Sequence, residues 1–104
     1  MSAYLDHAAS APVRPEVAAA LEPFLAARFG HPSSSHRAGR AARTALEEAR
    51  DTVARLLGAE PREVVFTSGG SEADNLAVLG VLGAADGPVT VVTSAVEHPA
   101  VQEA

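Results

Sequence analysis

The chain of 104 residues has no cysteine and no lysine, and all eight of its basic residues are arginine. A sequence without cysteine cannot offer a thiolate nucleophile, and one without lysine has no side-chain amine that could form a Schiff base. The lack of cysteine is compatible with any redox compartment. Covalent catalysis through either of these two groups therefore cannot be completed by the residues of this chain alone.

Clusters of positive charge and long hydrophobic runs are also missing. The net charge is −5, and the arginines of residues 43–55 are interspersed with acidic residues, so nucleic acid is not an expected partner. No stretch approaches the roughly 18 apolar residues that a membrane span needs, and residues 1–10 lack the basic start and hydrophobic core of a signal peptide. We therefore expect a cytoplasmic protein without a membrane partner.

The residues that are present suffice for one globular domain, since 47% of them are hydrophobic. Pro15, at a first helical position, and Gly30, as a stop signal, bound a first predicted helix. A second helix follows the loop 31–36 (HPSSSH), is capped by Ser35 or a neighbour, and ends at Gly58. Its apolar stripe has the spacing of an amphipathic helix and consists of Ala42, Leu46, Ala49, Val53 and Leu56.

The second half of the sequence alternates between strand and helix signals. Residues 63–67 (EVVFT) predict a strand, and residues 71–84 predict a helix so apolar that we expect other elements to cover it on several sides. Residues 89–93 (VTVVT) have the continuous apolar run of a strand in a parallel sheet. A last helix opens at residues 97–100, shortly before the sequence ends. This order predicts an α/β fold, and the late helix start suggests part of a larger protein.

The most informative stretch is residues 66–75 (FTSGGSEADN), in which the first predicted strand breaks at two glycines and opens directly into a helix. Gly69 and Gly70 allow the backbone to approach a ligand closely, and the first N–H groups of the helix, with its dipole, favour a phosphate. Ser71 adds a hydroxyl at the same place. An ordinary turn with Ser68 or Ser71 as the N-cap explains the same spacing, so the residues alone leave both interpretations open.

Four segments together resemble the N-terminal part of the cysteine desulfurases, which belong to the class V branch of the fold-type I pyridoxal-phosphate enzymes. They occur in the same order as in that family: residues 4–12 (YLDHAASAP), 30–39 (GHPSSSHRAG), 64–77 (VVFTSGGSEADNLA) and 97–101 (EHPAV). The resemblance implies that residues 1–104 are part of the large, mostly parallel-sheet domain. The rest of that cofactor domain and the small C-terminal domain would then lie outside this sequence.

The resemblance also implies roles for individual residues. Gly70 and Ser71 match the positions where the family holds the cofactor phosphate through backbone N–H groups and a hydroxyl, although Ala and Thr are usual there. His98 matches the histidine that stacks on the pyridine ring and acts as an acid or base. Considered without the family, a lone histidine beside a helix-starting proline is more often a cap or a surface residue.

Other candidates carry weaker implications. Asp6 and His7, with residues 8–12, match a segment near the substrate mouth of the family, or they form a structural lead-in. His31 stands where the family commonly has asparagine, so no contact is carried over to it. The spacing of the four histidines does not suit a metal site, so no metal is expected. Three polar residues of the helix start are assigned structural roles because helix N-termini attract acids: Glu72, Asp74 and Asn75.

The function implied for a full-length relative is the conversion of L-cysteine to L-alanine, with a persulfide sulfur left for iron–sulfur cluster assembly or thio-modification. The family's Schiff-base lysine, pyridine-binding aspartate, persulfide cysteine and carboxylate-binding arginine match no residue here, so these 104 residues are expected to be inactive alone. A homodimer and sulfur-acceptor proteins are the implied partners. Two alternatives stay open: another class V enzyme, such as an aminotransferase or a selenocysteine lyase, and a non-catalytic phosphate-binding or interaction module.

Overall fold

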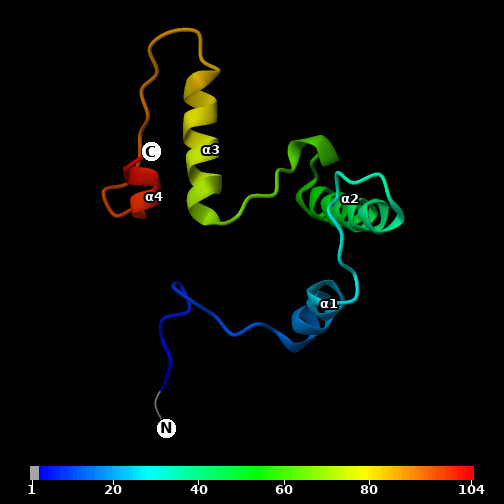
Figure 1. Cartoon of the computed structure of the whole chain (residues 1–104). Helices are drawn as coiled ribbons and strands as arrows, with labels where there is room; N and C mark the ends of the chain where they lie inside the picture. Colours follow the sequence, from blue (N-terminus) through cyan, green and yellow to red (C-terminus); the bar gives the residue numbers. More distant parts are fainter. Residues whose placement is uncertain (1–2) are drawn as a thin grey trace. The chain divides into compact units, whose positions relative to one another are not determined.

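The computed structural model describes residues 3–104 and divides the chain into two compact units. The first unit ends at Val64, and the second comprises Val65–Ala104. Four α-helices and one short 3-10 helix occur in the described residues, and Figure 1 labels the four α-helices. Among residues 3–104, no helix combines the length and the hydrophobicity that a bilayer crossing requires.

The first helix, α1, spans Pro15–Leu25 and ends before Gly30, the residue at which a stop was predicted. Pro15 occupies the beginning of the helix, where its missing N–H costs nothing. Pro23 lies inside the helix, where a proline removes a backbone hydrogen bond. The helix continues two residues past Pro23 and ends at Leu25, five residues before Gly30.

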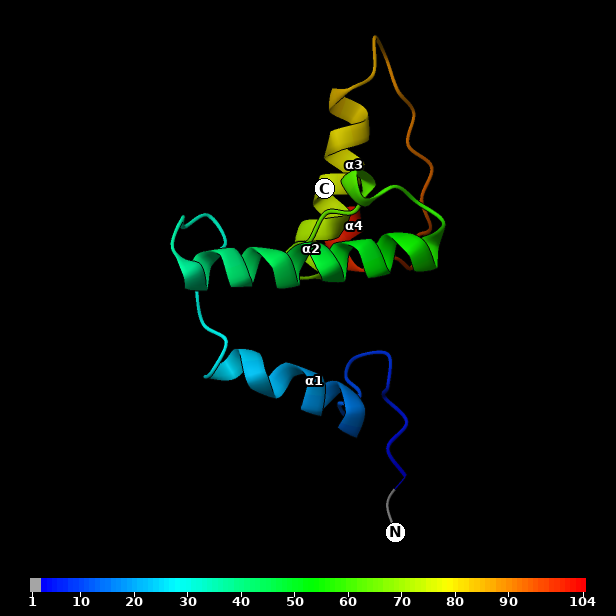
Figure 2. The ribbon, with the colours of Figure 1, turned by 90° about the vertical axis from the view of Figure 1, so that its right-hand side faces the viewer.

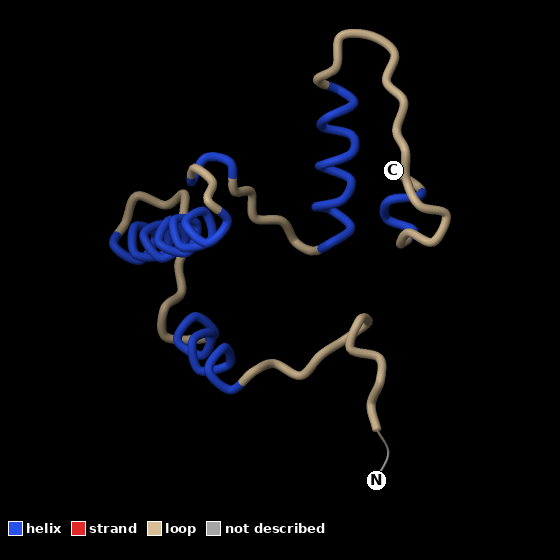
Figure 3. Tube along the Cα trace, turned by 180° about the vertical axis from the view of Figure 1, so that it is seen from behind, coloured by secondary structure: helices blue, strands red, loops and turns tan. Residues whose placement is uncertain are grey.

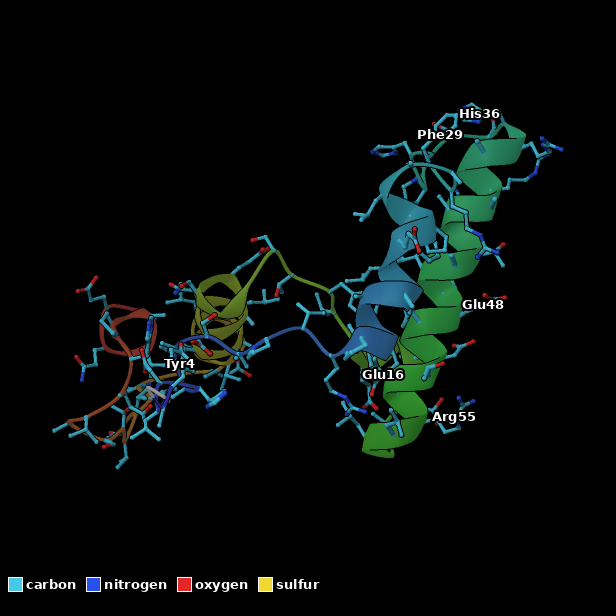
Figure 4. The ribbon with its side chains drawn as sticks, turned by 90° about the horizontal axis from the view of Figure 1, so that it is seen from below. Tyr4, Glu16, Phe29, His36, Glu48 and Arg55 are labelled. Carbon is cyan, nitrogen blue, oxygen red and sulfur yellow. The ribbon has the colours of Figure 1, made fainter. Side chains whose placement is uncertain are left out.

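The second helix, α2, spans Arg37–Leu57 and follows the prediction closely. His36, the neighbour of the predicted Ser35, is the N-cap, and its Nδ1 accepts a hydrogen bond of 3.2 Å from the backbone N–H of Gly39. Figure 4 shows His36 at the beginning of α2. Gly58 ends the helix in the left-handed conformation, with φ 67°, as predicted for a glycine C-cap.

A short 3-10 helix, η1 (Pro61–Glu63), packs against α2 and ends the first unit. The guanidinium of Arg50 donates a hydrogen bond to the backbone oxygen of Val64, which ties the end of this unit to the middle of α2. Ala54 is the one hydrophobic side chain that is fully buried in the described part of the chain, at 1% exposure. The first unit is therefore held largely by local hydrogen bonds around α2.

The second unit consists of α3 (Gly70–Gly83), a long connection and α4 (Pro99–Gln102). Figures 1 and 2 show the connection running back along α3, so that α4 lies beside the half of α3 that begins at Gly70. The observed start of α3 is within one residue of the predicted one. The observed start of α4 also falls where the sequence indicated a helix opening.

The two predicted strands are not formed in residues 3–104. Residues 64–67 and 88–94 are not assigned to a strand, and Figure 3 accordingly draws them as loop. A strand is stable only when a neighbouring strand satisfies its backbone N–H and C=O groups. No strand pairing is assigned in residues 3–104, so the predicted parallel sheet is not confirmed by the described residues.

The apolar residues of the predicted sheet and of α3 are exposed. Leu76 and Leu79 on α3 are each 50% exposed, and Val92 in the connection is 91% exposed. The sequence predicts that other elements cover α3 on several sides. The described residues do not provide this cover. Apolar surface of this extent favours association with other protein segments.

Candidate functional site

The turn before α3 is organised by one carboxylate. Glu72 Oε2 accepts a hydrogen bond of 2.7 Å from the backbone N–H of Ser68 and one of 2.6 Å from the Ser68 hydroxyl. The N-cap of α3 is Gly69, which provides no side-chain cap. The N-cap is therefore Gly69, and not Ser68 or Ser71 as the ordinary-turn interpretation predicted. Ser68 is engaged with Glu72 and leaves the beginning of the helix to Gly69, Gly70 and Ser71.

These hydrogen bonds also change the acidity of Glu72. The Ser68 hydroxyl, and after it the Ser68 backbone N–H, hold the pKa of the Glu72 carboxyl below its ordinary value. Glu72 is therefore ionised at neutral pH, and its negative charge is directed at the two Ser68 donors. The carboxylate acts as a brace across the turn, since it links the residue before the glycines to the first turn of α3.

The space beside the glycines is open. A Cβ atom placed on Gly69 or Gly70 would meet no heavy atom within 4 Å, and both residues are exposed. The first intrahelical hydrogen bond runs from the N–H of Ala73 to the oxygen of Gly69, so the N–H groups of Gly70 and Ser71 have no acceptor within the helix. Donors of this kind, together with the positive end of the helix dipole, suit a phosphate group.

His98 is the N-cap of α4. Its Nδ1 accepts a hydrogen bond of 3.1 Å from the backbone N–H of Ala100, and its backbone oxygen accepts from Val101 and Gln102. Because Nδ1 is the acceptor, the neutral ring carries its proton on Nε2. The capping role that the sequence allowed for this histidine is thus present, and it leaves the Nε2 side of an exposed ring for other interactions.

Asn75 connects α3 with α4, a contact that the sequence analysis missed. Its Nδ2 donates to the backbone oxygen of Ser71 at 2.9 Å and to the backbone oxygen of Ala100 at 3.1 Å. Ser71 and Ala100 are thereby joined through one side chain, and His98 lies only two residues before Ala100. The one available signal was the position of Asn75 one helical turn after Ser71, which does not by itself indicate a distant partner.

The remaining candidates lie in the first unit. Asp6 and His7 belong to a turn in which the Tyr4 hydroxyl donates to the backbone oxygens of Asp6 and Ser10, at 2.9 and 3.1 Å. The rings of Tyr4 and His7 meet edge to face, with centroids 5.0 Å apart. His31 Nδ1 accepts from the N–H of Ser33 at 3.2 Å, so its role here is to stabilise a local turn.

Two further features of the described residues bear on ligand binding. A groove in the first unit is lined by residues of both α1 and α2, among them Phe24, Phe29 and Ala42, and it contains none of the predicted site residues. Within residues 3–104, no three histidine, aspartate or glutamate side chains are grouped so that they could hold a metal ion. The open turn at Gly70 and Ser71, beside α4, stays the candidate site.

Comparison with known proteins identifies the wider group. Three relatives are the cysteine desulfurase IscS of Dictyoglomus turgidum, the IscS-like cysteine desulfurase of Mycobacterium tuberculosis and the cysteine desulfurase NifS of Azotobacter vinelandii. They are 50%, 49% and 46% identical to this sequence over 96%, 95% and 94% of the chain, respectively. The matches cover only 26%, 26% and 25% of those relatives, so the chain spans about a quarter of their length.

No solved structure matches this chain. The sequence does match the aminotransferase class-V family model over residues 3–104, which is the whole of the described chain. The resemblance predicted from the four sequence segments is confirmed by this match and by the named relatives. The chain belongs to the aminotransferase class-V family.

Proposed function

We propose that the chain is the N-terminal segment of a pyridoxal-phosphate-dependent cysteine desulfurase. A longer protein containing it would convert L-cysteine to L-alanine and leave a persulfide sulfur for iron–sulfur cluster assembly or thio-modification. The observation that carries the proposal is the identity of about half of all residues to proteins named cysteine desulfurase, over nearly the whole chain. The open turn at Gly70 and Ser71 supports it independently, because its donors suit the cofactor phosphate.

Within this segment, the backbone N–H groups of Gly70 and Ser71 and the Ser71 hydroxyl would bind the phosphate. Gly70 leaves open space where a side chain would otherwise stand. A hydrogen bond to a charged group contributes about 1.5–3 kcal/mol. The Glu72 brace would hold the turn in this shape and keep Ser68 occupied, so that the phosphate meets the helix N–H groups and Ser71.

His98 is the proposed catalytic residue of the segment. Its ring would lie against the cofactor, and Nε2 would hold or move a proton while Nδ1 stays bonded to the N–H of Ala100. When bound, pyridoxal phosphate supplies an electron sink for the substrate carbanion. The lysine that binds the cofactor covalently and the cysteine that accepts the sulfur would come from residues beyond these 104, which contain neither type.

The wider setting is also part of the proposal. The longer protein would act as a homodimer in the cytoplasm and deliver its sulfur to acceptor proteins. The isolated chain would be inactive, because it lacks both covalent catalysts. The exposed apolar residues of α3 and of the following connection would then be covered by the rest of the domain.

The test is a titration of the 104-residue chain with pyridoxamine 5′-phosphate, which carries the phosphate but no aldehyde that could react with the α-amino group. We expect the backbone amide signals of Gly70 and Ser71 to shift in 15N-resolved NMR spectra. Ser71→Ala should weaken the affinity by roughly 10- to 150-fold, the equivalent of one hydrogen bond to a charged group. Ser35→Ala, an exposed serine of the first unit, is the matched control and should leave the affinity unchanged. Unchanged Gly70 and Ser71 signals at saturating ligand would refute the proposed phosphate site.

A further inference from the structure

We propose that Asn75 is a positioning residue, whose side-chain amide holds α4, and with it His98, against the first turn of α3. This inference rests on the proposed function, because it assigns to Asn75 the task of keeping the His98 ring beside the phosphate turn. The ligand concerned is an aromatic phosphate that must reach Ser71 and His98 at once.

The first step of the argument is the chemistry of the amide. An asparagine Nδ2 has two hydrogens to donate, and at Asn75 one goes to the oxygen of Ser71 and the other to the oxygen of Ala100. Both donors are therefore used, on two backbone acceptors that belong to different helices. Asn75 is half-buried, so the two hydrogen bonds are partly shielded from competing water.

The second step leads from Ala100 to His98. The N–H of Ala100 donates to His98 Nδ1, while the His98 oxygen accepts from the N–H groups of Val101 and Gln102. Pro99, between the two residues, has its φ angle fixed by its ring. The segment from His98 to Ala100 is therefore short, hydrogen-bonded and stiff. A hydrogen bond that fixes the oxygen of Ala100 also fixes the position of His98.

The third step concerns what else holds α4. Its four residues are too few to form a stable helix without outside support. Gln102 Nε2 donates to the oxygen of Ala95 at 3.1 Å, but this bond closes the loop on itself and makes no link to α3. The hydrogen bond from Asn75 spans 25 residues of sequence and joins the two helices directly. Its loss should free the His98 ring from the phosphate turn.

The experiment uses the 104-residue chain and exploits its composition. The sequence has one asparagine and one glutamine, so the side-chain amide region of a 15N spectrum contains only the signals of Asn75 and Gln102. The ligand-free chain should show nuclear Overhauser effects from the Asn75 Hδ2 protons to protons of Ala100 and Val101. Absence of these effects would overturn the inference, whatever the chain binds.

The positioning role is tested with pyridoxamine 5′-phosphate and ring-labelled histidine. In the native chain, the ligand should shift both the Ser71 amide signal and the His98 ring signals, with the three other histidines as internal references. In Asn75→Ala, which keeps a strong helix former in α3, the Ser71 shift should persist while the His98 shift is lost. Asn75→Asp, which places an acceptor opposite two carbonyl oxygens, should behave in the same way. Circular dichroism at 222 nm checks that α3 is retained.

Gln102→Glu is the matched control, since it also exchanges a side-chain amide for a carboxylate, at the bond that stays within the loop. The His98 response should survive in this variant. A His98 shift of native size in Asn75→Ala would refute the positioning role and leave the phosphate site intact. If neither Ser71 nor His98 responds in the native chain, the proposed function and the positioning role both fail, while the Overhauser effects still decide whether Asn75 binds Ala100.

Discussion

Adding one methyl group should have opposite effects on two helical glycines of this chain. In Gly39→Ala, the new Cβ would lie 2.4 Å from the backbone oxygen of Ser34 and 2.8 Å from that of His31. Both distances are far below ordinary van der Waals contact. The 31–34 turn cannot yield easily, because the N–H of Ser34 donates to the oxygen of His31 at 2.9 Å and Arg43 Nε donates to the oxygen of Pro32 at 2.8 Å.

The cost of overpacking and the gain in helix propensity together decide whether each substitution stabilises or destabilises its helix. Overpacking of a tight contact costs about 1–3 kcal/mol, whereas exchanging glycine for alanine in a helix favours the helix by about 0.8–1 kcal/mol. Gly39→Ala should therefore lose about 1 kcal/mol of local stability at the start of α2. In Gly80→Ala, in the interior of α3, the new Cβ meets no heavy atom within 4 Å. No overpacking therefore opposes the gain in helix propensity, and α3 should be stabilised by about 1 kcal/mol. The difference of about 2 kcal/mol corresponds to roughly thirtyfold in the opening equilibrium.

The assay is residue-resolved amide hydrogen exchange, supported by circular dichroism at 222 nm. Exchange in the first half of α2 should become faster in Gly39→Ala, and exchange in α3 should become slower in Gly80→Ala. Slower exchange in both helices would refute the reasoning, since it would mean that the 31–34 turn moves aside without cost and that helix propensity alone governs both sites.

Three further predictions concern the turn, the stability and the chemistry of the chain. Ser68→Ala should raise the pKa of Glu72 towards its ordinary value, because the Ser68 hydroxyl is the main cause of its lowering. Because the pKa of Glu72 is lower in the folded chain, the Glu72 brace stabilises the turn at pH values above the ordinary glutamate pKa, and this stabilisation is lost as the pH falls through the lowered pKa. A Glu72 titration curve that is the same in Ser68→Ala as in the native chain, followed by NMR, would contradict this prediction. The chain, with Leu76 and Val92 exposed, should melt over a broad temperature range; a sharp, cooperative melting transition of a monomer in circular dichroism would speak against it. The purified chain with pyridoxal phosphate and L-cysteine should release no sulfide or alanine above a protein-free control, because it has neither lysine nor cysteine.

The sequence predicted those parts of the candidate site that depend on neighbouring residues, namely the starts of α3 and α4. The two glycines followed by a helix located the start of α3 to within one residue, and the His-Pro pair located the start of α4. The cap of α3 was not predictable in the same way. Serine is a common N-cap, but the helix begins after Gly69, one residue beyond Ser68, and the Ser68 hydroxyl donates to Glu72.

The sequence by itself determined the elements whose hydrogen bonds close within a few residues. The amphipathic stripe and the final Gly58 of α2 are of this kind, because helical bonds join residues four apart and a glycine adopts the left-handed conformation without a penalty. Tertiary structure alone decided which distant groups meet. The bond from Asn75 to Ala100 depends on how the connection after α3 returns to it, and no local pattern encodes that. The two segments predicted as strands, residues 63–67 and 89–93, form no strand in the described residues, because a sheet's hydrogen bonds come from a neighbouring segment and none is paired there.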